Sequence, residues 1–270
     1  MPVRLRAAAA SDIGPHRAIN QDAAFTASWG AAVADGVGGG PAGDLASAAF
    51  IHRLAASRVA SLDAESLAVS VRTANWDLRA HVERDPALSG MATTFTGLFV
   101  SHSETLLVAH TGDSRAYRLR GGVFAQQTRD DSYVQALVDR GLVAAADAAS
   151  HPRRNLITAS LSGGEGDAVG VLEHTAVAGD RWLICSDGLS DYVPDAEFAA
   201  LAAAGRSVEE TAAVCVALAL EAGTRDNVTV VVCDVVDAPT DAGTARGGIE
   251  DEPTFYGAAA YRYTERLESA

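Results

Sequence analysis

Aspartates beside small, turn-forming residues are the side chains of this 270-residue sequence best suited to chemistry. Each such cluster, taken singly, is most simply a turn, because aspartate bonds its own backbone and glycine accepts a positive φ. Asp35 and Asp187 differ, because each follows an apolar run, AAVA or WLIC, that would place its carboxylate at the end of a strand. The five clusters are Asn20-Gln21-Asp22, Ala34-Asp35-Gly36, Gly112-Asp113-Ser114, Ser186-Asp187-Gly188 with Asp191, and Arg225-Asp226-Asn227.

Carboxylates gathered at strand ends would repel one another unless cations lay between them. Hard oxygen ligands select magnesium or manganese over zinc. The sequence offers no cluster of histidines and cysteines as a competing set of ligands. The aspartates therefore predict a site for Mn²⁺ or Mg²⁺.

The basic residues exclude several other reaction classes. All 21 are arginine, so the sequence has no P-loop lysine, no kinase lysine and no lysine for a Schiff base. Neither a G-x-S-x-G nor an H-E-x-x-H motif occurs. The net charge of 21 − 35 = −14 argues against a nucleic-acid partner, because affinity for nucleic acid comes largely from cationic contacts to phosphates.

Groups of predicted strands alternate along the chain with predicted helices. These elements must position the aspartates. Apolar, β-branched runs predict strands, and apolar residues three and four positions apart predict helices. The connections between 93–100, 105–110 and 116–119 are too short for a crossover helix, so we expect antiparallel hairpins in a layered fold. The predicted strands are Ala23–Val33, Thr93–Val100, Thr105–His110, Ala116–Leu119, Arg181–Cys185 and Val228–Val236, and the predicted helices are Gly43–Ala60, Asp63–Arg84, Ser132–Arg140 and Val208–Ala222.

Residues 237–270 differ in composition from the rest of the chain. They are rich in Asp, Gly, Thr, Pro and Glu and poor in aliphatic residues, and such a segment buries too little apolar surface to offset its ordering entropy. We expect an acidic C-terminal extension that is largely disordered and adds little stability. The alternative is a short element around Phe255, Tyr256, Tyr261 and Tyr263 that docks on the domain or on a partner.

Several sequence features favour the cytoplasm. The longest apolar stretches, such as Ala212–Leu220, are far shorter than the roughly 20 residues that span a bilayer. The start, MPVRLRAAAASD, turns polar and lacks the apolar core of a signal peptide. Cys185, Cys215 and Cys233 have no metal-ligand spacing and fit reduced thiols packed in a core. We expect a cytoplasmic protein with no membrane partner.

Six ordered motifs resemble those of one enzyme family. They are S-D-I-G-P-H-R-x-x-N-Q-D, A-D-G-V-G-G, T-G-D-S-R-A-Y, H-P-R-R-N, C-S-D-G-L-S-D and R-D-N-V-T-V. In order and spacing they resemble the bacterial branch of the type-2C (PPM) metal-dependent serine/threonine protein phosphatases, over about residues 8–236. The resemblance implies an α+β four-layer sandwich, with two central antiparallel β-sheets flanked by α-helices on both faces. It also implies a catalytic domain at 1–236 with a flap subdomain at about 132–164.

The resemblance assigns the principal metal ligands. Asp35 is implied to bridge two divalent cations, and the carbonyl of Gly36 to bind one of them. Asp187 and Asp226 are implied to hold the other cation. Asp22 resembles the carboxylate that lies outside these ligands and orients water.

Four further residues receive roles from the same resemblance. Arg17 is implied to bind the substrate phosphate, and a guanidinium suits this role because its planar fork pairs bidentately with phosphate oxygens. Asp113 and Asp191 resemble the pair that holds a third, weakly bound cation. Asn227 is implied to orient its neighbour Asp226.

Two positions depart from the family pattern. Gln21 stands where many relatives have glutamate, which removes a negative charge from the surroundings of the metal ligands but keeps an oxygen. Val37 stands where animal relatives carry a histidine that is a proposed general acid. Protonation of the leaving group must then come from water or from another residue.

The resemblance implies hydrolysis of phosphoserine and phosphothreonine on proteins by water activated between two cations. The partners would be phosphorylated proteins, among them a serine/threonine kinase and its substrates, and we expect a monomer. One alternative is a partner-switching phosphatase that acts on an anti-sigma antagonist. Another is a pseudophosphatase that binds phosphoproteins without turnover, which the presence of Asp35, Asp187 and Asp226 disfavours.

Overall fold

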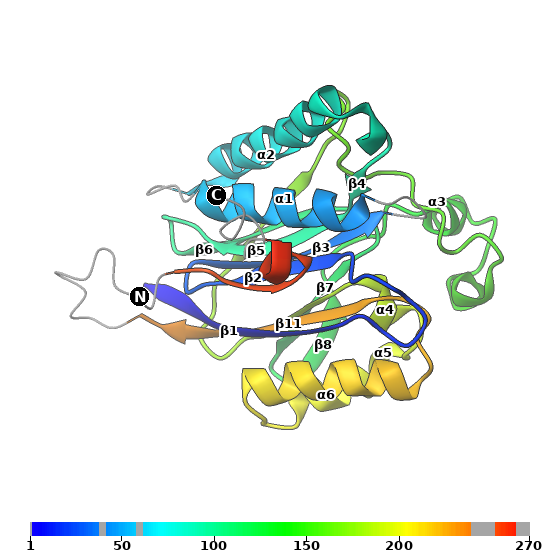
Figure 1. Ribbon diagram of the computed structural model, residues 1–270. Coiled ribbons are helices and arrows are strands. Elements are labelled where there is room, and N and C mark those ends of the chain that lie inside the picture. Colours follow the sequence, from blue (N-terminus) through cyan, green and yellow to red (C-terminus); the bar gives the residue numbers. More distant parts are fainter. Residues whose placement is uncertain (1, 38–41, 58–61, 239–251, 263–270) are drawn as a thin grey trace.

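Two antiparallel β-sheets lie face to face at the centre of the computed structural model, and helices cover both outer faces (Figure 1). The structure describes residues 2–37, 42–57, 62–238 and 252–262. The layers run helix, sheet, sheet, helix, which confirms the predicted four-layer α+β sandwich.

Within the described residues, the first sheet has five strands and the second has seven. The first runs in the order β1 (Val3–Asp12), β11 (Val228–Asp237), β10 (Arg181–Cys185), β7 (Arg115–Arg120) and β8 (Val123–Gln126). The second runs β12 (Thr254–Gly257), β2 (Asp22–Thr26), β3 (Gly30–Val37), β5 (Phe95–Val100), β6 (Thr105–Thr111) and β9 (Gly170–Thr175), and β4 (Ala92–Thr93) pairs with β3.

Alternation along the central strands divides the core into layers. In β11, Val231 packs between the two sheets, whereas Val230 and Val232 face the helices. In β3, Val33 packs between the sheets and Ala32 faces the opposite layer. Because successive side chains of a strand point to opposite faces, a strand buried on both faces is apolar throughout. This explains the continuous apolar runs of these strands.

The helices complete the outer layers. Helices α1 (Gly43–Ala56) and α2 (Ala64–Arg84) cover the second sheet, and α5 (Asp195–Ala203) and α6 (Val208–Glu221) cover the first (Figure 1). Both α2 and α6 begin with a capping box, in which the residue before the helix and the third helical residue bond each other's backbone N–H. The short helix α4 (Asp187–Ser190) follows β10 directly.

The segment 132–164 projects from the sandwich at the edge where α4 lies (Figure 1). It contains α3 (Tyr133–Asp139) and a 3₁₀ helix at Ala145–Ser150. One isolated bridge, Ser132 with Ile157, joins the two ends of the segment to each other, and a second, Thr93 with Leu161, fastens its C-terminal end to the rest of the domain.

One predicted strand differs from the structure, and several observed elements, β1 among them, were not predicted. The predicted strand Ala23–Val33 is a hairpin, because β2 and β3 are joined by a turn at 27–29. The N-terminal strand β1 was not predicted, and it pairs along its whole length with β11. Its alternating start, V-R-L-R, continues into four alanines, which carry little strand preference of their own.

The expectation of a largely disordered C-terminal extension is wrong for residues 252–262. Strand β12 pairs with β2, the residues that follow are helical, and Ala258 and Ala259 are fully buried. Without β12, β2 would be an edge strand with unpaired backbone groups. A short segment with few aliphatic residues can therefore dock, because the rest of the domain supplies the sheet and core. Tyr263 lies outside the described residues.

Candidate metal centre

The predicted metal ligands meet at one end of the two sheets. Asp22 and Asp35 stand directly opposite each other in the register of β2 and β3. Asp187 begins α4 just after β10, and Asp226 lies just before β11. Asp35, Asp187 and Asp226 border a cavity of about 180 Å³, whereas Asp22 and Asp191 are not among its lining residues. The lining residues are Arg17, Gln21, Asp35, Gly36, Val37, Thr94, Asp113, Asn155, Ile157, Asp187 and Asp226.

The backbone of Asp35 is held by Thr93, the last residue of β4, and by Thr94, which follows it. Thr94 Oγ1 accepts a hydrogen bond from the Asp35 N–H at 3.1 Å. The Asp35 carbonyl accepts two bonds, from Thr94 N–H at 2.8 Å and from Thr93 Oγ1 at 2.9 Å. These contacts fix the end of β3, so the Asp35 carboxylate is carried by a rigid support.

Close backbone approach explains two glycines of the motifs. A Cβ atom on Gly36 would lie 2.3 Å from the carbonyl oxygen of Gly43, and one on Gly188 would lie 1.9 Å from that of Asn227. No side chain fits at such distances. Glycine therefore lets α1 and α4 begin against the loops that carry the aspartates.

Asn227 links the loop that contains Arg17 to β11. Its Nδ2 donates to the carbonyls of Ile13 and Ile19, at 2.8 and 3.1 Å, and its Oδ1 accepts from Gln21 N–H at 2.8 Å. Only its backbone N–H reaches Asp226, donating to Oδ1 at 2.8 Å. The side chain thus positions the 13–21 loop, a contact that the motif pattern did not predict.

The aspartates of the cavity raise one another's pKa values. Burial raises the pKa of Asp35 and of Asp187 well above the usual range, and neighbouring carboxylates add to both shifts. Burial also raises the pKa of Asp22 to about 6, against a hydrogen bond from Ser186, and that of Asp113 to about 7. The pKa of Asp191 is raised by burial. The site holds more negative charge than its surroundings neutralise, and divalent cations would neutralise it.

The donor set fits such cations. Asp187 Oδ1 and Asp22 Oδ1 are buried, and within the described residues neither has a hydrogen-bond partner. Carboxylates and a backbone carbonyl are the ligands that Mg²⁺ and Mn²⁺ prefer, completed by water. In the described part of the chain, no three His, Cys, Asp or Glu side chains are already gathered as a ligand group.

Two arginines pair with the aspartates of the site. Arg17 Nη2 donates to Asp226 Oδ2 at 2.6 Å, so Arg17 competes with a cation for this carboxylate. Arg154, from the H-P-R-R-N motif, lies 3.4 Å from Asp191 through Nε and Oδ2. The family resemblance placed this motif within the flap at about 132–164, but it gave no sign of the charged partner of Arg154.

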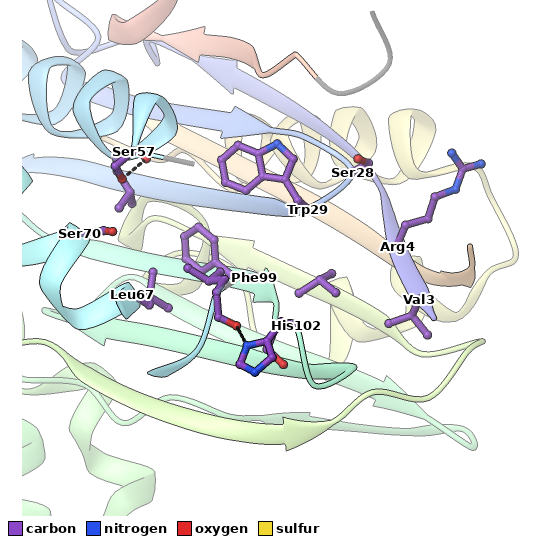
Figure 2. A pocket seen from close by; sticks show the side chains of 13 residues that line it. Val3, Arg4, Ser28, Trp29, Ser57, Leu67, Ser70, Phe99 and His102 are labelled. Carbon is purple, nitrogen blue, oxygen red and sulfur yellow. Dashed lines mark hydrogen bonds between the residues drawn. The ribbon is translucent and has the colours of Figure 1, made fainter. Parts of the chain in front are cut away.

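A larger cavity of about 300 Å³ lies at the opposite end of the β2–β3 hairpin (Figure 2). Trp29, Phe99 and Leu67 provide apolar walls. His102 Nδ1 is paired with the carbonyl of Leu62 at 2.8 Å, and no aspartate or glutamate lines this cavity among the described residues. Its size does not make it a candidate for metal chemistry, so the smaller acidic cavity is the candidate site.

Related sequences identify the family. The family model of protein phosphatase 2C matches residues 16–219. The serine/threonine protein phosphatase PstP of Mycobacterium tuberculosis is 43% identical over 272 residues, which cover 96% of this chain and 51% of PstP. The serine/threonine phosphatase stp of Listeria innocua is 34% identical over 210 residues, which cover 75% of this chain and 82% of that protein.

Solved structures indicate the same family as the related sequences. The crystal structure of M. tuberculosis PstP/Ppp has a TM-score of 0.82 at 41% identity and covers 87% of this chain and 100% of its own. The PstP catalytic domain in complex with 2 manganese ions has a TM-score of 0.79 at 40% identity, with the same coverage. This chain belongs to the protein phosphatase 2C family, as its six motifs predicted. It spans about half the length of PstP.

None of the helices in the described ranges is both long enough and apolar enough to span a membrane.

Proposed function

We propose that this chain is a metal-dependent phosphatase that hydrolyses phosphoserine and phosphothreonine on proteins, with two cations of Mn²⁺ or Mg²⁺. The observation that supports it most is the gathering of Asp35, Asp187 and Asp226 with Gly36 around one acidic cavity. The PstP catalytic domain, 40% identical to this chain, is in complex with two manganese ions.

The chain's own groups divide the tasks of hydrolysis. When bound, the cations act as Lewis acids and lower the pKa of an attacking water. Asp35, Asp187, Asp226 and the Gly36 carbonyl would hold them. Asp22 receives the Ser186 hydroxyl on Oδ2 at 2.7 Å, which leaves Oδ1 to orient water. Arg17 would exchange Asp226 for the phosphate and align the phosphorus for in-line attack.

The decisive experiment is hydrolysis of a phosphothreonine peptide by the purified 270-residue chain, with and without manganese. We expect turnover only with the metal, restored by Mn²⁺ after chelation. Equal turnover without metal would contradict the mechanism. Binding of the peptide without turnover in Mn²⁺ would instead support the pseudophosphatase alternative.

Replacing Arg17 by alanine should mainly weaken binding of the phosphate. We expect KM for the phosphopeptide to rise about 10-fold or more, and inhibition by inorganic phosphate to weaken similarly, because a charge-assisted bidentate contact is lost. Arg17→Lys should not restore the wild-type KM, since an ammonium lacks the planar fork. Steady-state kinetics and phosphate inhibition test this, and a loss confined to kcat would refute the assignment.

Asp113→Ala and Asp191→Ala should lose most turnover but keep two tightly bound cations. Both carboxylates lie beside Asp187, whose pKa they help to raise, and a third cation with few protein ligands should bind weakly. Manganese titration of activity should show a weak phase in the wild type that is missing from both variants, with Asp191→Ala the milder change. Wild-type rates and an unchanged titration would show that Asp113 only caps its turn.

The partner and compartment follow from the proposed reaction. Phosphorylated proteins would be the substrates, and the opposing enzyme a serine/threonine kinase in the cytoplasm; we propose that the chain acts as a monomer. The three cysteines, all free and buried, support a reducing compartment. The partner-switching alternative differs only in substrate, so activity on a phosphorylated anti-sigma antagonist, compared with a phosphorylated kinase, separates the two.

We propose further that the catalytic unit extends beyond 1–236, with 132–164 as its flap. Asn155 and Ile157 of this segment line the acidic cavity, which supports a role in substrate access. Residues 252–262 belong to the same unit, because β12 completes the sheet that carries Asp22 and Asp35.

A further inference from the structure

The segment 257–262 lies over the two loops that carry part of the candidate metal site. We propose that it positions the metal centre, by holding the backbone of Asn20–Asp22 and, through Asp44, the approach of α1 to Gly36. Its helical turn (red in Figure 1) follows β12, the neighbour of β2, and Ala258 and Ala259 of this turn share a buried cluster with residues of α1. The proposal rests on the metal-binding function inferred above, and it assigns a task to a segment that lies outside the six motifs.

The first contact is made by the backbone of Gly257. This glycine pairs with Ala23 and has φ of +60°. A Cβ atom on it would lie 2.2 Å from the carbonyl oxygen of Asp22 and 3.0 Å from Ser11 Oγ. The C-terminal segment thus lies directly against the peptide that carries Asp22.

The second contact comes from Tyr261. Its hydroxyl donates to the carbonyl oxygen of Asn20 at 2.7 Å. The Asn20 side chain in turn accepts from the Asp22 N–H at 3.1 Å and donates to Ser11 Oγ at 2.9 Å. Tyr261 therefore anchors the residue that holds the Asp22 backbone.

The third contact is an ion pair between Arg262 and Asp44. Arg262 donates through Nε at 2.8 Å and through Nη2 to the same oxygen, Asp44 Oδ2. Asp44 is only 2% exposed and lies in the first turn of α1. Its neighbour Gly43 is the residue whose carbonyl packs against Gly36. A shift of Asp44 would therefore reach the peptide whose carbonyl is the proposed metal ligand.

The same turn of α1 also reaches Gln21. Ser47 Oγ donates to the Gln21 carbonyl at 2.6 Å, and Gly36 N–H donates to the same oxygen at 3.1 Å. The 13–21 loop, the end of β3 and the start of α1 thus converge on one oxygen. Tyr261 and Arg262 fasten the outer sides of this junction.

Apolar contacts dock the segment independently of these polar groups. Ala258 and Ala259 are fully buried, and Phe255 packs on His52 with ring centroids 4.1 Å apart. His52 Nε2 also pairs with the Ala259 carbonyl at 2.7 Å. Removing Tyr261 Oη or the Arg262 guanidinium should leave the segment in place, so positioning can be tested apart from folding.

The test uses the full chain with Tyr261→Phe, Arg262→Ala and the double change. Tyr256→Phe is the matched control, because it removes a hydroxyl contact of the adjoining strand β12, to Thr26 Oγ1 at 3.4 Å. Thr26 pairs with Thr254, at the opposite end of β12 from Gly257. Calorimetric titration with Mn²⁺ alone measures metal affinity, and amide hydrogen exchange of the metal-free protein measures protection of residues 13–22 and 42–50.

In the double variant we expect Mn²⁺ to bind about 10-fold more weakly, the loss typical when groups that orient metal ligands are removed. Residues 13–22 and 42–50 should exchange faster, whereas Tyr256→Phe should match the wild type in both measurements. Arg262→Lys should recover part of the affinity, because the charge on Asp44 stays paired. A double variant with wild-type Mn²⁺ affinity overturns the proposal, and so does an equal loss in Tyr256→Phe.

The proposed function can fail separately. If the wild-type chain binds no Mn²⁺, the metal-dependent function is wrong, and hydrogen exchange alone decides the positioning. In that case, unchanged protection of residues 13–22 from hydrogen exchange in the double variant would overturn the proposed positioning role of the segment 257–262.

Discussion

Asp35→Asn, Asp187→Asn and Asp226→Asn should each lower kcat for a phosphothreonine peptide by at least about 10³-fold, which corresponds to about 4 kcal/mol of barrier. The neutral amide keeps the shape of the side chain but loses the charge that would hold a cation. Stopped assays at saturating Mn²⁺, with metal content measured on the same samples, test this expectation. A near-normal rate in any variant would refute the role of that residue.

Two of these substitutions, Asp35→Asn and Asp187→Asn, should not destabilise the metal-free protein. Burial and neighbouring carboxylates raise the pKa of Asp35 and Asp187, so their charged forms oppose folding at neutral pH. Asp35→Asn and Asp187→Asn should therefore keep or raise the Tm without metal. They should also lose the increase in Tm that Mn²⁺ gives the wild type. A structural role would produce the opposite pattern, with a lower Tm in the absence of metal.

Asp180 provides the matched control. It is 2% exposed and precedes β10, at the opposite end of that strand from Asp187. Arg120 pairs with it, donating through Nε to Oδ1 at 2.7 Å. Asp180→Asn should lower the Tm, because it weakens a buried ion pair, but it should retain kcat and Mn²⁺ binding.

Ending the chain at Ala238 should lower the free energy of unfolding by about 2–4 kcal/mol, because buried apolar groups and ladder hydrogen bonds are lost. For a domain of this size that corresponds to a fall in Tm of roughly 5–15 °C. The loss includes the pairing of β12 with β2 and the burial of Ala258 and Ala259. Thermal unfolding of the metal-free protein measures it.

A chain that ends at Arg262 keeps all of these contacts and should retain the wild-type Tm. An unchanged Tm after truncation at Ala238 would contradict the docking of β12. It would also restore the composition-based expectation that residues 237–270 add little stability.

Local sequence determined the chemistry and the family. Asp35 and Asp187 could be placed at strand ends because the apolar runs before them are long and unambiguous, and the structure has β3 and β10 there. The lack of lysine and the surplus of aspartate favoured metal chemistry over amine chemistry. These signals are local, since they depend on residue type and on spacing of a few positions.

Tertiary structure alone decided which charges meet. The opposition of Asp22 and Asp35 depends on the turn at 27–29, which the apolar pattern of Ala23–Val33 concealed. Arg17 reaches Asp226 across 209 positions of sequence, and Arg154 reaches Asp191 from the flap. No short-range pattern encodes such pairs, because the register of the sheets sets them.

The docking of the C-terminal segment shows most clearly what the sequence alone does not predict. The sequence T-F-Y-G has too few residues to form a stable strand by itself, and the alanines after it have no amphipathic pattern. Their order comes from pairing with the edge of β2 and from burial in the core beneath α1. The composition of a segment indicates how much apolar surface the segment can bury by itself. The structure also shows the surface of the domain against which the segment packs.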